Sequence, residues 1–227
     1  MKHFVRTENN LTPEVYQKIQ NKSVMIAGLG GVGSYALESI ARLGINNLTI
    51  CDFDVVDESN INRQLVALKS TIGQKKVLIA EKRLRDINPK VSLRIFDEKI
   101  ASDTIEEVFS APLDFVIDAI DDIPAKLLII KMCLKKNIPF ISVMGTANKL
   151  NPQGFAITEI KKTTYDPIAR IIRRKLKDEA IFDKVMVICS KEMPLQREGL
   201  SSNSFVPATA GLLSTSYALQ KLMEECK

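Results

Sequence analysis

The stretch SVMIAGLGGVGSYALESIARLG, residues 23–44, decides the expected fold. Its first residues are mostly apolar and predict a buried strand, and its second half places apolar side chains at helical spacing. Between them stands a GxGGxG pattern, so backbone amides at a helix N-terminus can face a bound anion. A tight structural turn alone would need fewer than four glycines. The predicted nucleotide-binding glycines are Gly28, Gly30, Gly31 and Gly33.

Strands and helices alternate after this stretch. Apolar strands are predicted at 48–54, 91–97, 114–120 and 138–145, and helices between them at 74–88, 104–109 and 125–137. Such alternation is typical of a parallel sheet covered by helices on both faces. The sequence therefore predicts an α/β fold with a Rossmann-like, doubly wound, mainly parallel sheet.

The last third has a different pattern, with strands at 155–160 and 184–190, a basic helix at 166–177 and a polar loop up to residue 205. An apolar helix follows and should pack back on the sheet. We expect a mixed α/β appendage packed on the core. We expect one domain, 1–227, made of an ATP-binding core (1–150), a substrate-side insertion (151–205) and a returning helix (206–227).

Composition excludes several classes of protein. The chain has 227 residues, of which 45% are hydrophobic and 26% charged, as in an ordinary globular protein. Its N-terminus lacks the apolar core of a signal peptide, and no apolar run approaches the roughly 20 residues of a membrane helix. We expect a cytoplasmic protein with no membrane partner. The net charge of +5 leans weakly toward a polyanionic partner.

Histidine and cysteine chemistry is poorly supported. His3 is the only histidine and lies in the N-terminal tail, which disfavours a mechanism with a scaffolded histidine base. The four cysteines form no CxxC pair, so a cysteine metal site is not expected.

Polar residues near the second strand distinguish between nucleotides. Asp52 lies 24 residues after Gly28 at a strand end, where an acid can accept both ribose hydroxyls of ATP or NAD. Arg63 and Lys76 then add two cations, which suit a triphosphate better than the pyrophosphate of NAD. Asn60 and Gln64 belong to the same predicted ATP site. No GxxxxGK[ST] pattern occurs, so this is not a P-loop.

Acids end the third strand of the predicted sheet. Asp118, Asp121 and Asp122 come at the same edge as the glycine loop, where an acid could hold the Mg²⁺ that bridges phosphates. Any one of Arg63, Lys76 and Asp121 alone would be read as a solvated surface charge. Their convergence on one strand edge favours a site.

These motifs resemble the ubiquitin-activating-enzyme superfamily (ThiF, MoeB and HesA), whose bacterial members adenylate carboxyl groups. The matching pieces are GLGGVG (28–33), CDFD (51–54), SNINRQ (59–64), Lys76 and IDAIDD (117–122). The resemblance implies that Asp52 holds the ribose, that Asn60, Arg63 and Lys76 contact phosphates, and that Asp121 serves Mg²⁺. It also implies that Arg6 reaches a phosphate, often across a dimer. Lys126 stands where the family has an arginine.

Further segments resemble the tRNA threonylcarbamoyladenosine dehydratase branch of that superfamily. They are RTENNL (6–11), MGTANKLNP (144–152), DPIARIIRRKLK (166–177), SKE (190–192) and SFVPATAG (204–211). The resemblance implies an enzyme that uses ATP and Mg²⁺ to adenylate the carboxylate of N6-threonylcarbamoyladenosine in tRNA and closes a ring with loss of water. The resemblance does not identify which ring forms, which tRNAs are substrates or whether a monovalent ion is needed. We also expect a homodimer, since Arg6 precedes the first strand by enough chain to reach a neighbouring site.

Two other functions remain open at this point. One is adenylation of the C-terminal glycine of a ubiquitin-like sulfur carrier, with a sulfur-transfer partner protein. The missing zinc cysteines argue against this function. Cys189 is interpreted as a core residue more than as a nucleophile. The other is an NAD-dependent oxidoreductase or a nucleotide sensor, which would leave Asn60, Arg63 and Lys76 without a role.

The predicted basic helix carries a cationic stripe. Arg170, Arg173, Arg174 and Lys177 recur at i, i+3, i+4 and i+7, opposite an apolar side. A stripe of this kind is usually a solvated face. The branch resemblance favours contacts with tRNA phosphates instead, which would position the RNA without reading its sequence. DNA is not expected as a partner.

Overall fold

The strand predicted after residue 22 is β1, one of the inner strands of a seven-stranded sheet. The computed structural model describes residues 2–226, so the first and last residues of the expected domain lie outside the described residues. The strands are β1 (Ser23–Ala27), β2 (Asn47–Cys51), β3 (Ser92–Phe96), β4 (Phe115–Asp118), β5 (Phe140–Val143), β6 (Phe155–Glu159) and β7 (Met186–Ser190). The helices are α1 (Val5–Leu11), α2 (Pro13–Gln20), α3 (Gly33–Arg42), α4 (Lys76–Ile87), α5 (Ile105–Val108), α6 (Ile123–Lys136), α7 (Pro167–Asp178) and α8 (Phe205–Glu224).

The strand order is β3-β2-β1-β4-β5-β7-β6, and each neighbouring pair is parallel except β7 and β6. The expected α/β fold with a mainly parallel, doubly wound sheet is confirmed. Residues 151–205 do more than pack on the sheet, because they lengthen it by two strands. β7 pairs with β5, and β6 closes that edge in the antiparallel direction.

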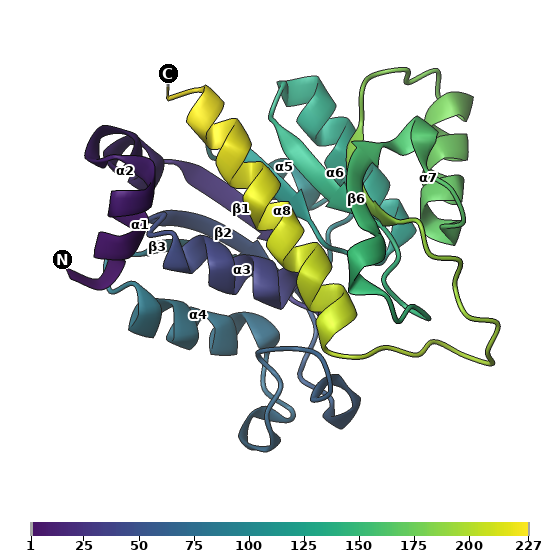
Figure 1. The fold of residues 1–227 in the computed structure, drawn as a ribbon, viewed down its shortest axis with the longest axis horizontal. Coiled ribbons are helices and arrows are strands. Elements are labelled where there is room, and N and C mark those ends of the chain that lie inside the picture. The colour runs from purple at the N-terminus through teal and green to yellow at the C-terminus, as the bar shows by residue number, and fades with distance from the viewer. Residues whose placement is uncertain (1, 227) are drawn as a thin grey trace.

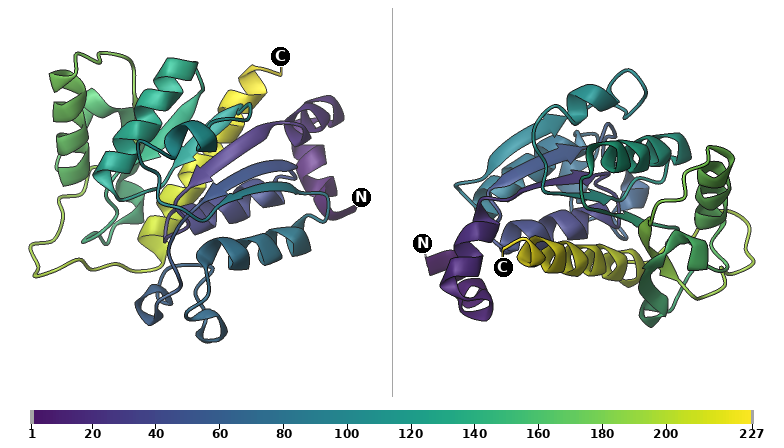
Figure 2. Two further views of the ribbon diagram at one scale, coloured as in Figure 1. Left: turned by 180° about the vertical axis from the view of Figure 1, so that it is seen from behind. Right: turned by 90° about the horizontal axis from the view of Figure 1, so that it is seen from above.

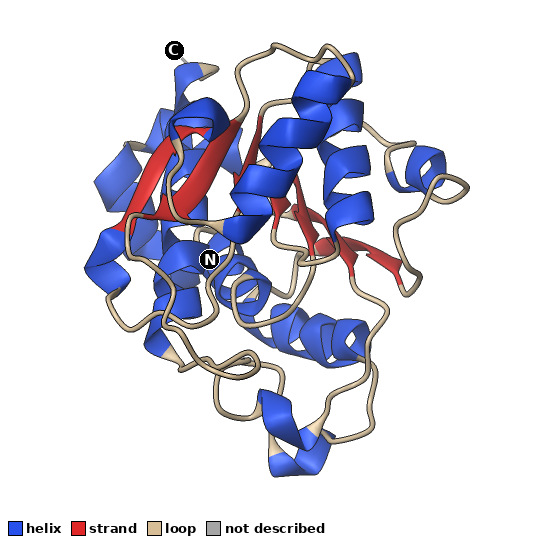
Figure 3. Ribbon diagram, turned by 90° about the vertical axis from the view of Figure 1, so that its right-hand side faces the viewer, coloured by secondary structure: helices blue, strands red, loops and turns tan. Residues whose placement is uncertain are grey.

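Helices cover both faces of the sheet (Figures 2 and 3). Alternate residues of β1 point to opposite sides, as a strand requires: Val24 and Ile26 join the core under α3, α4 and α8, whereas Met25 and Ala27 join the core under α5, α6 and α7. All four are fully buried. Burial on both faces explains why β1, β2 and β4 read as continuous apolar runs.

The N-terminal segment is helical, which the sequence patterns did not reveal. α1 and α2 meet at Thr12, and Pro13 begins α2, where its fixed backbone suits the first helical turn. Both helices lie beside the C-terminal end of α8 (Figure 1), where Lys18 Nζ donates to Cys226 O at 2.7 Å. Within residues 2–226, none of the helices combines the length and apolar character needed to cross a bilayer.

Candidate active site

One cavity of about 940 Å³ opens at the carboxyl ends of the central strands. Its walls come from the segments after β1, β2, β3, β4 and β5, together with the start of α7, the loop before α8 and the start of α8. β1 lies between β2, the next strand in the chain, and β4. The strand order changes direction there, and open α/β sheets bind ligands in the crevice at such a point.

The glycine loop forms the floor of this cavity. Gly28 has φ +87°, a conformation that L side chains rarely adopt, and an added Cβ would lie 2.8 Å from the carbonyl oxygen of Ala119. An added Cβ on Gly33 would collide with the carbonyl oxygen of Gly28. Gly30 and Gly31 line the cavity, and a Cβ on Gly30 would meet nothing closer than 3.8 Å. Gly28 and Gly33 therefore shape the turn, while Gly30 keeps the backbone open to a ligand at the start of α3.

Asp52 lies at the end of β2 beside this loop. Its Oδ2 accepts a hydrogen bond from Leu29 N at 2.6 Å, and its Oδ1 accepts one from Asp54 N at 2.9 Å. The side chain is buried, yet it lines the cavity. Burial raises the pKa of the Asp52 carboxyl, and the nearby Lys76 ammonium opposes that shift. The two backbone amides fix the carboxylate where it lines the cavity.

The segment after β2 supplies a polar wall. Asn60, Arg63 and Gln64 all line the cavity, as the sequence motif predicts. Arg63 Nη1 donates to Ser59 O at 2.8 Å, which holds the guanidinium at the wall. Gln64 is buried, and its Oε1 has no hydrogen-bond partner within the described residues. A buried acceptor without a partner is costly, so a ligand donor there would be favourable.

Lys76 begins α4 and lines the same cavity. Its ammonium lies 2.7 Å from Asp54 Oδ2. The lysine side chain is 5% exposed and the aspartate side chain 48% exposed. The Lys76 ammonium is thus held at the cavity wall by Asp54. If the ammonium moved to a bound anion, water could solvate the exposed Asp54 carboxylate.

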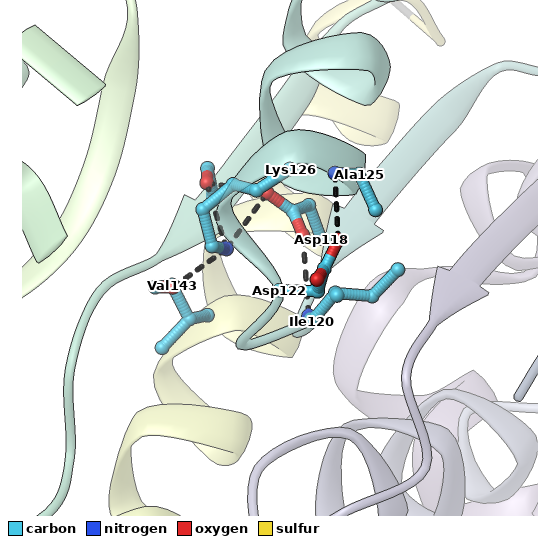
Figure 4. A network of polar contacts seen from close by, with 7 residues as sticks. Asp118, Ile120, Asp122, Ala125, Lys126 and Val143 are labelled. Atoms are coloured by element: carbon cyan, nitrogen blue, oxygen red, sulfur yellow. Dashed lines mark hydrogen bonds and ion pairs between the residues drawn. The ribbon is translucent and has the colours of Figure 1, made fainter. Parts of the chain in front are cut away.

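Asp118, the last residue of β4, and Asp121 and Asp122, which follow it, have three different environments. Figure 4 shows the first and the last of these acids. Asp118 is fully buried, and its Oδ2 lies 2.9 Å from Lys126 Nζ. Asp122 caps α6, since its Oδ2 accepts a hydrogen bond from Ala125 N at 3.0 Å. Asp121 is exposed, lines the cavity and makes no hydrogen bond or ion pair within the described residues. Asp121 is therefore the acid available to a ligand or metal ion.

Lys126 does not line the cavity. Its ammonium is enclosed by Asp118, by Ser142 Oγ at 3.3 Å and by the carbonyl oxygen of Val143 at 2.9 Å (Figure 4). This network joins the ends of β4 and β5 to α6. At the position of the family's arginine, the chain thus has a buried cation that fastens two strand ends.

Asp121 is the candidate magnesium ligand of this cavity. Residues 2–226 contain no group of three or more His, Cys, Asp or Glu side chains placed to coordinate a metal ion. Asp121 beside the glycine loop fits a Mg²⁺ that takes most of its oxygens from phosphates and water, as Mg²⁺ commonly does.

Arg6 lies far from the cavity of its own chain. Pro207, near the start of α8, lines the cavity, whereas α1 and α2 lie at the other end of that helix. α8 has 20 residues and therefore spans about 30 Å. The segment before β1 is folded on its own chain and holds Arg6 away from this cavity. Arg6 is exposed on α1, so only a second copy could receive it in its cavity.

The basic stripe of α7 divides into two groups. Arg170, Arg174 and Lys177 are exposed. Arg173 is partly buried, and its Nη1 donates to Ile160 O at 3.2 Å and to Thr163 O at 3.0 Å. Arg173 therefore fastens the preceding loop to α7. The first turn of α7 brings Ile168 to the cavity wall.

Cys189 lies on β7 and is buried. Burial raises the pKa of its thiol to about 11, so very little thiolate forms near neutral pH. This agrees with its interpretation as a core residue.

Several wall residues were not found from the sequence. Thr146 and Ala147 follow β5, and Leu200, Ser201 and Ser202 lie in the loop before α8. They fall inside or beside segments that carried the branch resemblance, but no residue type in them indicates a known chemistry.

The fold and the glycine-loop cavity define an α/β protein with a candidate nucleotide site, and the chain belongs to the ThiF family, whose model matches residues 5–222. The chain is 40% identical to tRNA threonylcarbamoyladenosine dehydratase of Bacillus subtilis, over 98% of this chain and 95% of the relative. It is 31% identical to the crystal structure of the Escherichia coli tRNA N6-threonylcarbamoyladenosine dehydratase in complex with ATP, with a TM-score of 0.95, covering 99% of this chain and 95% of that one. The expected superfamily membership is confirmed.

A relative from another part of the family is more distant. The chain is 30% identical to the SAMP-activating enzyme E1 of Haloferax volcanii, but the match covers 67% of this chain and 57% of that protein. Similarity to the dehydratases extends through residues 151–205, since those matches cover nearly the whole chain.

Proposed function

We propose that this chain is an ATP-dependent dehydratase of N6-threonylcarbamoyladenosine in tRNA, acting through a carboxylate adenylate in the cytoplasm. The observation that carries the proposal is one cavity in which a glycine loop, Asp52, the buried Lys76 and the free Asp121 converge. The nearly full-length similarity to dehydratases, one of them solved with ATP, supports the substrate. We propose that all of 1–227 works as one domain.

The positions of the wall residues suggest how ATP lies. Asp52 would accept the ribose hydroxyls, and the amides at Gly30 and Gly31 would face the phosphates. Lys76 and Arg63, assisted by Asn60 and Gln64, would neutralise the triphosphate. Asp121 would hold Mg²⁺, which supplies positive charge to the phosphate oxygens as the leaving pyrophosphate gains negative charge.

The reaction then needs positioning and charge stabilisation more than proton transfer. A carboxylate oxygen of the substrate attacks the α-phosphorus, and the bond from that phosphorus to the bridging oxygen breaks, releasing pyrophosphate. A nucleophile within the same side group attacks the acyl carbon, and AMP leaves with the former carboxylate oxygen. The nucleophile loses a proton, so the sum is loss of one water. The chain's part is to align the carboxylate in line with the leaving group and to stabilise the pentavalent phosphorus with Arg63 and Lys76.

α7 is the proposed contact for the tRNA backbone. Arg170, Arg174 and Lys177 present cations on the exposed side of a helix whose first turn borders the cavity. Phosphates bound there would hold the tRNA beside the site. Arg173 lies in the same cationic stripe. Its Nη1 is bonded to the carbonyl oxygens of Ile160 and Thr163, which leaves the rest of its guanidinium for such a contact.

A homodimer is the proposed active form, because Arg6 can reach a cavity only in a second copy. A sulfur-transfer protein stays a predicted partner. No feature of the described residues identifies where it would bind.

The direct test incubates the protein with ATP, Mg²⁺ and total tRNA and measures the nucleosides by mass spectrometry. We expect N6-threonylcarbamoyladenosine to lose the mass of one water, with release of AMP and pyrophosphate. Unchanged tRNA, together with pyrophosphate exchange that depends on a ubiquitin-like carrier, would instead establish the carrier-activating function. ATP and NAD titrations test the oxidoreductase alternative.

A further inference from the structure

The cavity has a second half that the nucleotide motifs do not use. The parallel strands place their following loops in the order β3, β2, β1, β4, β5 along the carboxyl edge. Asp52 follows β2, the glycine loop follows β1 and Asp121 follows β4, so the proposed ATP runs from β2 toward β4. Adjacent strands are about 4.8 Å apart. The loop after β5 therefore lies just beyond the reacting phosphate.

Apolar and small polar side chains share the walls of this second half. We call it the acceptor pocket, lined by residues 143–147, Ile168 and residues 200–202. Leu200 lines the cavity although it is 90% exposed, so water reaches nearly all of its side chain. Apolar surface left in water at a cavity wall is favourable to cover, and a flat base can cover it.

Asn148 makes several of the hydrogen bonds that hold the loop carrying Leu200. Asn148 has φ +58°, and its Oδ1 accepts hydrogen bonds from Ser201 N at 2.7 Å and Ser201 Oγ at 2.8 Å. Its Nδ2 donates to Gly199 O at 3.2 Å. Its backbone pairs with the same loop, donating to Ser201 O and accepting from Leu195 N, both at 2.8 Å. Asn148 thus attaches the loop to the segment that follows β5.

Lys149 attaches the start of α7, the third wall of the acceptor pocket, to the segment after β5. Its side chain is buried, and its Nζ lies 2.9 Å from Asp166 Oδ2 and donates to Gly145 O. Asp166 in turn caps α7, since its Oδ1 accepts from Ala169 N at 3.0 Å. The pair therefore sets the first turn of α7, with Ile168, against Gly145. Asn148 and Lys149 together assemble all three walls of the acceptor pocket.

We propose that the acceptor pocket binds the modified purine nucleoside itself, with the base between Ile168 and Leu200 and the carboxylate directed toward Asp121 and the glycine loop. The inference rests on the proposed function and deepens it. α7 begins at this pocket with Ile168 and carries the exposed cations Arg170, Arg174 and Lys177 further along, so a polyanionic strand bound along α7 would bring its nucleoside to the pocket. Asn148 and Lys149 are positioning residues that hold the walls without contacting the reacting atoms.

The first experiment measures steady-state dehydration of modified tRNA by Leu200→Ala and by a matched control, Leu78→Ala. Leu78 is 56% exposed on α4 and does not line the cavity. We expect Leu200→Ala to raise the KM for tRNA roughly ten-fold, as for a leucine that the substrate buries. ATP affinity and kcat should stay unchanged, and the control should match wild type. If wild type converts tRNA and Leu200→Ala has the same KM, the pocket assignment fails while the proposed function stands.

The second experiment does not depend on turnover. Trypsin can cut after Arg197, which is exposed in the loop that Asn148 holds. Free N6-threonylcarbamoyladenosine should slow this cut in wild type and not in Leu200→Ala. Asn148→Gly keeps the left-handed backbone but removes the side-chain bonds to Ser201 and Gly199, so the cut should be faster. Equal cutting with and without the nucleoside would overturn the proposal, even if the wild-type enzyme were inactive on tRNA.

Discussion

Lys76 Nζ lies 2.7 Å from Asp54 Oδ2, and the lysine is buried while the aspartate is half exposed. In the proposed complex with ATP, the ammonium exchanges this carboxylate for a phosphate. Asp54→Asn removes the competitor, so we expect ATP to bind roughly two- to five-fold more tightly. Lys76→Met should weaken ATP binding on the order of ten- to hundred-fold, because a charge-assisted contact is lost. Calorimetric titration checks both, and weaker binding by Asp54→Asn would contradict the exchange.

Asp121→Ala should abolish dehydration while the protein stays folded. Asp121 makes no bond within the described residues that the fold needs, whereas Asp118 neutralises the buried Lys126 and Asp122 caps α6. We therefore expect an unchanged thermal midpoint for Asp121→Ala and a lowered one for Asp118→Ala. Turnover measured against Mg²⁺ concentration is the test. Full activity of Asp121→Ala at saturating Mg²⁺ would move the metal role away from this residue.

Arg6→Ala should lower turnover more than ATP affinity, as expected of a group that acts on the transition state. Because Arg6 would act in the cavity of the second copy, mixing Arg6→Ala with Lys76→Met should restore activity. Each mixed dimer then has one site with both an intact Arg6 and an intact Lys76. Light scattering should give a dimer at micromolar concentration. A monomer, or a mixture that stays inactive, would rule out the shared site.

Neutralising the exposed side of α7 should weaken tRNA binding and reduce its salt dependence. The variant Arg170→Gln with Arg174→Gln removes two cations, so fewer counterions are released when tRNA binds. ATP affinity should not change. Binding measured over a series of salt concentrations gives the slope, and an unchanged slope would exclude this side of α7 from the RNA interface. Arg173→Gln serves as a contrast, since its fastened guanidinium predicts a loss of stability.

Cys189→Ser should reduce stability by about 1 kcal/mol and leave the chemistry intact. Because burial raises the pKa of this thiol, the thiolate fraction is small at neutral pH and increases only as the pH approaches 11. Alkylation of the folded protein by iodoacetamide should be slow at pH 7 and accelerate toward that pH. A folded Cys189→Ser protein without activity would indicate a thioester intermediate.

The sequence predicted those features of the fold that depend on local pattern. Continuous apolar runs and the GxGGxG pattern identify β1, α3 and the edge at which the site lies. Local pattern cannot tell which of Asp118, Asp121 and Asp122 is free, because the answer depends on Lys126, which folds back from α6 onto Asp118. The same holds for Arg173, whose spacing matches the stripe while its partners lie in a separate loop.

The acceptor pocket was missed for a related reason. Asn148 and Ser201 are ordinary loop residues, 53 positions apart, and only the folded chain brings them together. The N-terminal helices were missed because residues 2–20 are rich in polar side chains, and their helical state is supported by packing on the end of α8.

The close approach of α8 to the glycine loop affects when the cavity is complete. A Cβ on Gly211 would overlap the carbonyl oxygen of Val32, so this glycine lets α8 pack tightly against the start of α3, where Pro207 lines the cavity beside Gly31. Ribosomes make α8 after every other wall of the cavity. A nascent chain that already contains its glycine loop, Asp52, Lys76 and Asp121 therefore still has one open wall, and it becomes competent for nucleotide chemistry only after α8 has been made and has docked.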